Sequence, residues 1–556
     1  MTVMPRVAIC LTLLVLSASA QTASLQAQTA GYRIHGTVVN AQTGEPLPKI
    51  QVVIGGAEQS EATESTLTEE AGRFEFENLK PGKYWLEAEG HGFTRQRFEQ
   101  HEEYATAVAV GPNLEIQEIL FRAQPDATID GNIADEQGEA IREGNVMLFR
   151  GGAHDGTVSI QMVSTAPIDD QGHYRFGRLG AGTYFLAVLT HPWYAQTRPG
   201  LRSRPAFNSR AASDPEPDPQ AQAQFDVAYP ITYYPGTRDP NSATPVVVGP
   251  GQHASADISL AAVPAVHLHI SNAVGDPSQG IGTNVMERVF GTVAMPVPGE
   301  TSDLRNGELE ISGIPDGQFT LALRGVGNTA GDREKQISVS GDAQIDAADA
   351  SPPPTISGMV RLDTGEPLPQ FTALRFSSHD QEGTGVGVNA KGRFEFNGDE
   401  NGLPPGLYEI SVTAPVDLLV KNISATGARV FGREVDISGS NRVRLVVTVS
   451  EGHGRVDGRA LRHGKPVSGA MIVLVPSDME HNSSLVRRDQ SDSDGTFSLA
   501  NTLPGKYTVV AIEDGWGLEW LKREVMQPFL RDGQPVEVTA GGRLKITVDV
   551  QQPLAH

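Results

Sequence analysis

Apolar and polar residues alternate over short stretches of this chain, which predicts β-strands rather than helices. In Gly72-Arg-Phe-Glu-Phe76, for example, charged residues flank both phenylalanines. Alternation with a period of two sends one set of side chains into a core and the other set into water. The chain is therefore predicted to form antiparallel sheets that are buried on one face.

The same pattern recurs five times along the chain. In each copy a glycine is followed by apolar residues two and four positions later, and Leu or Ile then stands shortly before Gly-x-aromatic. The spacing predicts one strand, a turn and a second strand in every copy. The first glycines of the copies are Gly72, Gly172, Gly307, Gly392 and Gly495, and the aromatic residues are Tyr84, Tyr184, Phe319, Tyr408 and Tyr507.

The turn between the two strands carries Pro-Gly in several copies. In Lys80-Pro-Gly-Lys83 and Leu503-Pro-Gly-Lys506, Pro stands at i+1 and Gly at i+2. This order predicts a type II turn in which the glycine takes a positive φ. The aromatic residue that follows is in register with the apolar face. We therefore expect a core ring whose hydroxyl fixes the turn, as in a tyrosine corner, rather than a platform for stacking a sugar.

An earlier strand precedes most copies and contains a glycine. Gly36 and Gly358 are each followed by Thr-Gly-Glu-Pro-Leu-Pro, and Gly131 and Gly458 stand in similar strands. A glycine inside a strand followed by a Gly-x-Pro turn predicts a strand that bends or bulges and then reverses.

Together these residues resemble the carboxypeptidase regulatory-like domain. The resemblance is strongest over 33–122, 353–450 and 453–550, recognisable over 125–262 and weaker over 265–350. It implies a transthyretin-like (prealbumin-type) β-sandwich, grouped with carbohydrate-binding-like folds. In metallocarboxypeptidases such a domain follows the catalytic domain and is not itself the catalyst. The predicted fold class is all-β, with about five tandem Ig-like or transthyretin-like β-sandwich domains arranged as beads on a string.

Length and motif spacing predict the domain boundaries. The chain has 556 residues, which suits four or five domains of ordinary size. A polar leader at 21–31 is predicted to be flexible. The predicted sandwiches span 32–123, 124–263 with a long mobile loop at 197–224, 264–350 as the divergent copy, 352–450 and 451–552.

The first twenty residues have the pattern of a secretory signal peptide. Arg6 supplies the positive charge, residues 7–16 form a short apolar stretch, and Ala18-Ser-Ala20 is a cleavage motif. Cleavage after Ala20 predicts a secreted or periplasmic protein. No later segment approaches the 18 apolar residues of a membrane span. Cys10, the chain's one cysteine, lies in this signal, so no disulfide or thiolate site is expected.

Charge and motifs point away from nucleic acid and from catalysis. The net charge is −23, which suits solubility and repels phosphate backbones. We find no nucleophile, metalloprotease or nucleotide motif and predict no catalytic residue, metal or cofactor. His267 and His269 would need a third zinc ligand. Asp492-Ser-Asp-Gly495 resembles the start of a calcium loop, but Leu503 stands at its twelfth position, so an ordinary Asx-turn is expected.

Aromatic residues outside the repeated pattern are the weak candidates for ligand binding. Trp193 and Tyr194 precede the predicted loop, and Tyr233 and Tyr234 follow it. These four rings either line one sugar-binding patch or pack beneath the loop as a satellite core. Trp516 and Trp520 form a second candidate patch. Their spacing with Leu521 and Val525 also predicts a short helix that ends before Pro528.

The leading functional prediction is a secreted, non-catalytic binding and spacer protein of the cell envelope. The first alternative is binding of a polysaccharide by one or more domains. The second alternative is an accessory protein to an uncharacterised hydrolase. The expected partners are therefore polysaccharides or other envelope proteins.

Overall fold

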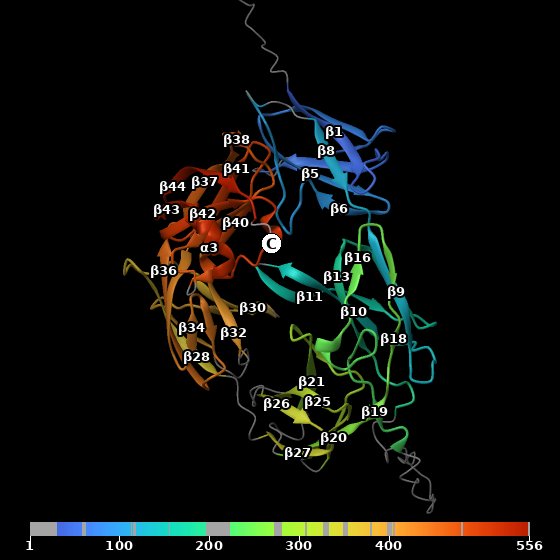
Figure 1. The fold of residues 1–556 in the computed structure, drawn as a ribbon. Helices are drawn as coiled ribbons and strands as arrows, with labels where there is room; N and C mark the ends of the chain where they lie inside the picture. Colours follow the sequence, from blue (N-terminus) through green and yellow to red (C-terminus); the bar gives the residue numbers. More distant parts are fainter. Residues whose placement is uncertain are drawn as a thin grey trace, which may run out of the picture.

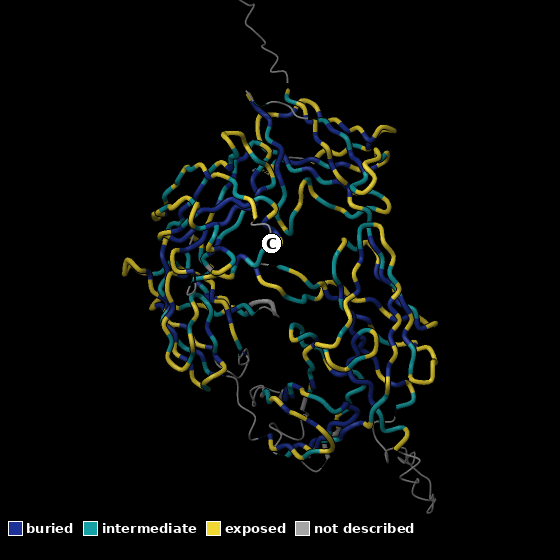
Figure 2. The backbone as a smooth tube through the Cα atoms, in the orientation of Figure 1, coloured by how far each residue is buried: buried dark blue, intermediate teal, exposed yellow. Residues whose placement is uncertain are grey.

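The fold consists of β-sheets that follow one another in pairs along the chain. In the computed structural model the described residues are 31–57, 63–112, 114, 118–154, 156–195, 223–271, 281–305, 308–325, 333–347, 354–378, 381–396, 403, 406–416, 418–479 and 482–553. Five main hydrophobic clusters fill the sandwiches, and each draws its residues from one continuous part of the chain. Figure 2 shows buried backbone inside each sandwich and exposed turns between strands. The all-β fold of tandem sandwiches is confirmed, whereas the domain boundaries stay a prediction.

The first two sandwiches consist mainly of strands, and the second contains the long β10–β11 hairpin. The first has β1 (Tyr32–Asn40), β2 (Gln51–Gly56), β3 (Glu64–Leu67), β4 (Arg73–Leu79), β5 (Gly82–Gly90), β6 (Phe93–Arg97), β7 (Val108–Val110) and β8 (Ile119–Ala123). The second has β9 (Ala127–Ala134), β10 (Asn145–His154), β11 (Thr157–Pro167), β12 (His173–Leu179), β13 (Gly182–Leu189), β14 (Val227–Ala228), β15 (Thr232–Tyr233), η1 (Pro240–Ser242), β16 (Val246–Val248), β17 (His253–Ser255), β18 (Ile258–Ser259) and β19 (Val263–Pro264).

Strands also make up the third and fourth sandwiches. The third has β20 (Val266–Ser271), β21 (Ile281–Val289), β22 (Val293–Pro296), β23 (Thr301–Arg305), β24 (Glu308–Ile314), β25 (Gly317–Gly325), β26 (Arg333–Val339) and β27 (Ala343–Asp346). The fourth has β28 (Thr355–Leu362), β29 (Ala373–Ser378), β30 (Gln381–Gly387), β31 (Arg393–Phe396), β32 (Leu407–Thr413), β33 (Leu418–Thr426), β34 (Arg429–Phe431), β35 (Glu434–Asp436) and β36 (Arg442–Glu451).

The fifth sandwich adds a short helix. It has β37 (Gly454–Arg462), β38 (Lys465–Pro466), β39 (Met471–Pro476), η3 (Ser483–Leu485), β40 (Arg487–Gln490), β41 (Thr496–Thr502), β42 (Gly505–Ile512), η4 (Gly515–Gly517), α3 (Arg523–Arg531), β43 (Gln534–Val538) and β44 (Arg543–Gln551). The helix is as predicted in kind but not in extent, because it begins at Arg523 and continues past Pro528. Met526 and Phe529 are buried on its inner face, so packing holds the last turn.

All five sandwiches share one pairing scheme. In one sheet, the opening strand pairs antiparallel with the Gly-x-Phe-x-Phe strand and parallel with a later strand, as β1 does with β4 and β8. In the other sheet, a single strand separates the strand that carries the repeated aromatic residue from one edge strand. This edge strand is β3, β11, β22, β30 and β40 in the five sandwiches. In the fifth sandwich the two sheets are continuous, because β42 also pairs with β44.

The glycine of the opening strand makes room for two neighbours. A Cβ atom on Gly36 would lie 2.2 Å from the carbonyl oxygen of Ile119 and 2.9 Å from the ring of Phe74. The same holds at Gly358, where a Cβ atom would lie 2.7 Å from the ring of Phe394. The register irregularity of β1 lies earlier, between Tyr32 and Ile34. The glycine therefore serves close packing, while the strand does carry an irregularity before it and does reverse after it, at the antiparallel bridge between Val39 and Pro46.

The aromatic turn is confirmed as a core device, but its backbone differs from the prediction. The hydroxyls of Tyr84, Tyr184 and Tyr507 each donate a hydrogen bond to the carbonyl four residues earlier, at 3.0, 2.7 and 2.9 Å. Gly82 and Gly505 do not take a positive φ, so the predicted type II turn is wrong.

The residue with positive φ stands four positions before this glycine. It is Asn78 in the first sandwich, at 59°, and Asn501 in the fifth, at 52°. A Cβ atom on Gly505 would lie 3.3 Å from the ring of Tyr507. The nearby ring thus accounts for the glycine at position 505, whereas a Cβ atom on Gly82 would meet nothing within 4 Å.

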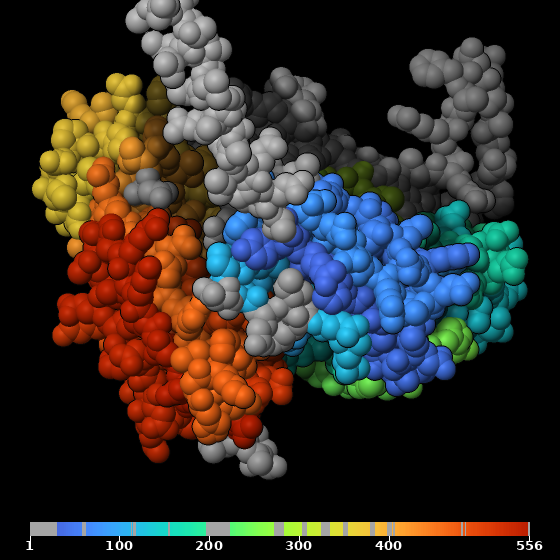
Figure 3. Space-filling model, turned by 90° about the horizontal axis from the view of Figure 1, so that it is seen from above, coloured from blue at the N-terminus to red at the C-terminus, as the bar shows by residue number. Residues whose placement is uncertain are grey.

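The five sandwiches are arranged in a closed loop (Figure 1). The fourth and fifth return toward the first, and the space-filling view shows the first sandwich in blue directly against the last in orange and red (Figure 3). The β10–β11 hairpin crosses from the second sandwich to the fifth. Beads on a string therefore describes the order of the domains, while the two end domains also contact each other.

Replacing Tyr507 tests the role of the repeated ring. We expect Tyr507→Ala to destabilise the fifth sandwich by about 3–5 kcal/mol, because a large buried side chain is removed. Tyr507→Phe, the matched control, loses only the hydrogen bond to Leu503 and should cost about 1 kcal/mol. Urea unfolding of the full chain, followed by the fluorescence of Trp516 and Trp520, measures the change in unfolding free energy of both variants. If Tyr507→Ala unfolded at the same urea concentration as the parent chain, the core role would be contradicted.

Candidate functional site

The exposed aromatic pair lies at the end of the second sandwich. Trp193 is 80% exposed, and its ring meets Tyr194 edge-on, with ring centres 5.8 Å apart and planes at 85°. The Tyr194 hydroxyl is hydrogen-bonded to Tyr229, and burial raises the pKa of both phenols. Residues on the two sides of the predicted loop therefore do come together, although the loop itself, at 197–224, lies almost wholly outside the described residues.

The two tyrosines that follow the loop do not join this surface. Tyr233 is only 1% exposed, and its ring meets Phe290 of the third sandwich, with centres 4.7 Å apart. Tyr234 packs against the core of the second sandwich instead. Successive residues at the end of β15 point to opposite sides, which separates the two rings. The four aromatics thus do not form one patch, and ligand binding by Trp193 and Tyr194 stays a prediction.

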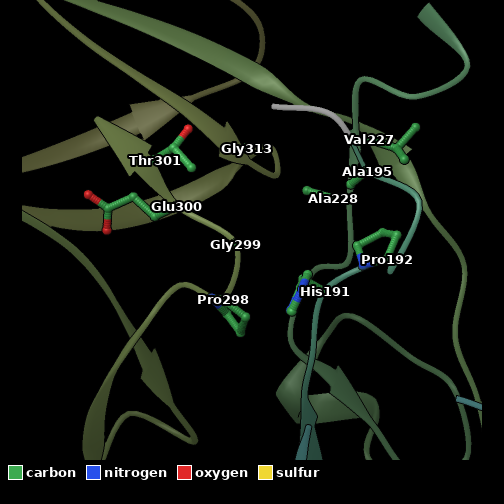
Figure 4. Close-up of a pocket in the computed structure, with 10 residues that line it drawn as sticks. All are labelled: His191, Pro192, Ala195, Val227, Ala228, Pro298, Gly299, Glu300, Thr301 and Gly313. Atoms are coloured by element: carbon green, nitrogen blue, oxygen red, sulfur yellow. The ribbon is translucent and has the colours of Figure 1, made fainter. Parts of the chain in front are cut away.

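A small cavity lies beside the aromatic pair, between the second and third sandwiches. Its volume is about 250 Å³, and its walls come from four parts of the chain (Figure 4). This volume is slightly below the ~300–1,000 Å³ of common ligand pockets, so it suits one small ring. The lining residues are His191, Pro192, Ala195, Val227, Ala228, Pro298, Gly299, Glu300, Thr301 and Gly313.

Glu300 lines the wall of this cavity that belongs to the third sandwich. One of its oxygens accepts a hydrogen bond from the backbone N–H of Val285 at 2.9 Å, and burial raises the pKa of the carboxyl group. Figure 4 places Glu300 and Thr301 opposite His191 and Pro192, with the carboxylate of Glu300 directed away from them. The carboxylate therefore serves a hydrogen bond within its own sandwich, and the polar side chain on the facing wall is His191.

A histidine links the second and third sandwiches next to the cavity. His267 on β20 is hydrogen-bonded to Asp226 at 2.9 Å and to Glu310 at 3.1 Å, and its backbone N–H donates to Asp342. The bond to Asp226 is the largest contribution that raises the pKa of His267 to about 9. The imidazole is therefore a cation that joins two carboxylates, while His269 on the same strand is exposed.

The first and last sandwiches meet through the turn between β40 and β41. One oxygen of Asp492 accepts the backbone N–H of Ala107 at 2.9 Å, and the other is 2.5 Å from the Nζ atom of Lys83. Ser493 exchanges hydrogen bonds with Ala107 and Ala109. We call the contacts of Lys83, Ala107 and Ala109 with Asp492 and Ser493 the clasp.

Arg488 lies beside the clasp and is only 4% exposed. It forms ion pairs with Glu102 at 2.8 Å and with Glu103 at 3.6 Å, both in the first sandwich. Its guanidinium also lies 5.2 Å from the ring of Tyr104 and 4.4 Å from the ring of Trp520. A buried cation with both carboxylate and aromatic partners adds to the contact between the two end domains.

Trp516 and Trp520 belong to this contact and are not an exposed patch. Both are buried, and the ring of His101 stacks on Trp516, with centres 5.0 Å apart and planes at 6°. At the tip of the β10–β11 hairpin, a Cβ atom on Gly156 would lie 2.6 Å from the ring of Trp520. The two tryptophans therefore serve contacts between domains, and neither presents a free face for a sugar.

The clasp was missed by sequence reasoning, although its turn was noticed. In the same turn of the second sandwich, Asp169 accepts the N–H groups of Gln171 and His173. In the fifth sandwich Asp494 caps the turn instead, and Asp492 points to Lys83. The second carboxylate in Asp492-Ser-Asp-Gly495 was the available signal.

Within the described residues, no cluster of three His, Cys, Asp or Glu side chains is placed to hold a metal ion. No helix in the same ranges is long and apolar enough to cross a membrane.

Comparison with known proteins assigns the first sandwich. The family model described as carboxypeptidase regulatory-like domain matches residues 33–113. The resemblance is thus confirmed for this part of the chain. No curated protein matches the chain by sequence.

Solved structures with similar segments include a Bacillus anthracis protein and streptococcal pilins. The Bacillus anthracis TIE protein is 9% identical over 94% of this chain and 74% of its own, with a TM-score of 0.17. The streptococcal ancillary pilin is 11% identical over 52% of this chain and 100% of its own, at 0.18. The minor pilin GBS52 of Streptococcus agalactiae is 14% identical over 36% of this chain and 97% of its own, also with a TM-score of 0.18. These scores are too low to bear on function.

The pH dependence of the third sandwich tests the role of His267. Its pKa rises from about 6.5 in the unfolded chain to about 9 in the fold. The stabilisation should therefore be complete below about pH 6.5 and be lost as the pH rises through 9. In the parent chain, the melting temperature of the third sandwich should fall between pH 7 and 9. We expect this fall to disappear in His267→Gln and to persist in the control variant, His269→Gln. An unchanged pH profile in His267→Gln would show that the histidine is not the group that titrates.

Proposed function

We propose that this protein is a secreted, non-catalytic binding and spacer protein of the cell envelope. The observation that carries the proposal is the clasp, which joins domains about 400 residues apart along the chain. Two buried charged groups, Asp492 in the clasp and Arg488 beside it, are used for contacts between domains. The match of the first sandwich to a regulatory-like domain agrees with a role in binding or positioning.

A spacer needs a fixed geometry, and three sets of contacts supply it. The clasp and Arg488 join the first and fifth sandwiches. The hairpin tip is held on the fifth sandwich, where Leu521 donates its N–H to Gly156. Phe290 of the third sandwich packs among aromatic rings of the second. Contacts that close a loop of domains restrict interdomain motion more than linkers do.

Location outside the cytoplasm is supported by the start of the sequence. Residues 1–20 have the charge, apolar stretch and Ala-Ser-Ala ending of an exported protein. The remainder of the chain contains no cysteine, so folding after export needs no disulfide. Other envelope proteins are therefore the proposed partners of the spacer.

Polysaccharide binding is the second candidate function. It is favoured by Trp193, which is 80% exposed and whose ring contacts that of Tyr194 at nearly a right angle. An exposed, supported indole next to a small cavity is an arrangement that suits stacking of a sugar ring. A polymer bound at this surface could also be handed to a hydrolase, which is how an accessory role would operate.

Breaking the clasp tests the spacer proposal. Removing one partner of a buried, hydrogen-bonded charge pair costs about 2–5 kcal/mol, so Asp492→Ala should open the loop of domains. Small-angle scattering of the full chain should then show a larger radius of gyration. Asp169→Ala, in the same turn of the second sandwich, is the control and should leave the radius unchanged. An extended, flexible parent chain would overturn the proposal.

Removing the exposed indole tests the polysaccharide alternative. We expect Trp193→Ala to weaken retention on an envelope polysaccharide by about 1–3 kcal/mol, or roughly fivefold to 150-fold. Phe371→Ala is the control, because Phe371 is 86% exposed on the fourth sandwich. Retention of the parent chain on no polysaccharide, or equal retention of both variants, would reject binding at Trp193.

A further inference from the structure

The edge strands of the five sandwiches differ in how they are protected. An exposed strand edge offers unpaired N–H and C=O groups, and natural proteins shorten or charge such edges. β3 and β22 have four residues each, and β22 ends in proline. β40 is Arg-Arg-Asp-Gln, and β30 contains three glycines and Glu382. Four of these five edge strands, which take the equivalent place in their sheets, therefore follow this rule.

β11 is the exception. It runs over 11 residues, Thr157–Pro167, with no charged residue and with its only proline at the end. Val158, Met162 and Val163 are 66%, 42% and 49% exposed. Among the described residues, β10 is the only strand that pairs with β11, so its other edge is open.

The start of β11 is held in position by contacts with the fifth sandwich. Gly156 accepts the N–H of Leu521 at 3.3 Å, and the N–H of Val158 is hydrogen-bonded to Glu519. These bonds fix the hairpin tip on the fifth sandwich, and β10 supports the strand along its length. An edge that is already ordered loses little entropy when another strand pairs with it.

The leader 21–31 matches this edge in length, charge and pattern. It has 11 residues, Gln-Thr-Ala-Ser-Leu-Gln-Ala-Gln-Thr-Ala-Gly, and none is charged. Ala23, Leu25 and Ala27 alternate with polar residues, which is the pattern of a strand. β11 shows the same alternation at Val158, Ile160 and Met162. Two uncharged strands can meet without repulsion in a chain whose net charge is −23.

The leader 21–31 cannot pair with β11 of its own molecule. If all 11 leader residues lay along β11, Gly31 would have to lie beside the hairpin. Tyr32, the next residue, already begins β1 and pairs with Leu79. Figure 1 places β1 far from the hairpin, with β6 between them. The leader must therefore come from another copy of the chain.

We propose that β11 accepts the leader 21–31 of a second copy as an added β-strand. Backbone hydrogen bonds supply the attraction, and the alternating apolar side chains set the register. Because donor and acceptor are different surfaces, each copy can accept one leader and donate its own. The contact is head-to-tail, and it builds open chains of copies. This inference rests on the proposed secretion, because cleavage after Ala20 exposes the leader.

Binding of a synthetic peptide with residues 21–31 tests the contact. The acceptor is the full chain without residues 1–31, studied by calorimetry. We expect saturable binding, and Met162→Lys with Val163→Lys should weaken it by at least about tenfold, because charge on an edge opposes pairing. Val247→Lys is the matched control, since Val247 is an exposed valine on β16 of the same sheet. Unchanged thermal unfolding shows that the variants are folded.

Self-association of the chain that begins at Gln21 gives the second readout. Sedimentation should show oligomers that grow with concentration, and both removal of 21–31 and excess peptide should return the chain to monomer. No peptide binding, equal binding by the β11 variant, or oligomers that persist without the leader would overturn the inference. The mass of the exported chain reports cleavage after Ala20 separately, so a failure of secretion is distinguishable from a failure of strand pairing.

Discussion

The closed arrangement of the five domains depends on the pairing of one buried carboxylate. Asp492 is removed from water by the contact between the first and last sandwiches, and burial raises its pKa although Lys83 opposes the shift. An isolated buried charge would be costly, so both oxygens need partners, and the first sandwich provides them through Lys83 and the N–H of Ala107. The carboxylate is satisfied when the end domains are together. The loop of domains is therefore closed by a requirement of polar chemistry and not by apolar area alone.

The turn that precedes the Gly-x-Phe-x-Phe strand caps itself in some sandwiches and contacts another domain in the fifth. This difference comes from one additional acidic residue, Asp494. In the second and fourth sandwiches, Asp169 and Asn389 cap their own turns through backbone N–H groups. In the fifth, Asp494 performs part of this task by accepting the N–H of Thr496, which leaves Asp492 able to face outward. A repeated element thus acquires an interdomain role without a change of fold. This is why function is to be sought where the copies differ.

The sequence predicted the fold well because its determinants are local. Alternation in residues 72–76 and the ring of Tyr507 act within a few positions, and the hydroxyl of Tyr507 binds the carbonyl only four residues away. The turn type was wrong because the positive φ falls on Asn501 and not on Gly505, and asparagine tolerates this conformation. Tyr233 and Trp520 were misplaced for another reason. Their burial depends on Phe290 and on Gly156, which belong to other domains, and no local pattern records such contacts.

The closed arrangement also explains why one strand departs from the usual protection of sheet edges. The hairpin of β10 and β11 must be long, because its tip at Gly156 crosses from the second sandwich to the Trp520 ring of the fifth. Ile160, along this span, packs in the cluster shared with the third sandwich, so charge there would be removed from water. A strand that bridges domains in this way is necessarily long and locally apolar. The exposed edge of β11 is thus a physical consequence of the same contacts that hold the domains together.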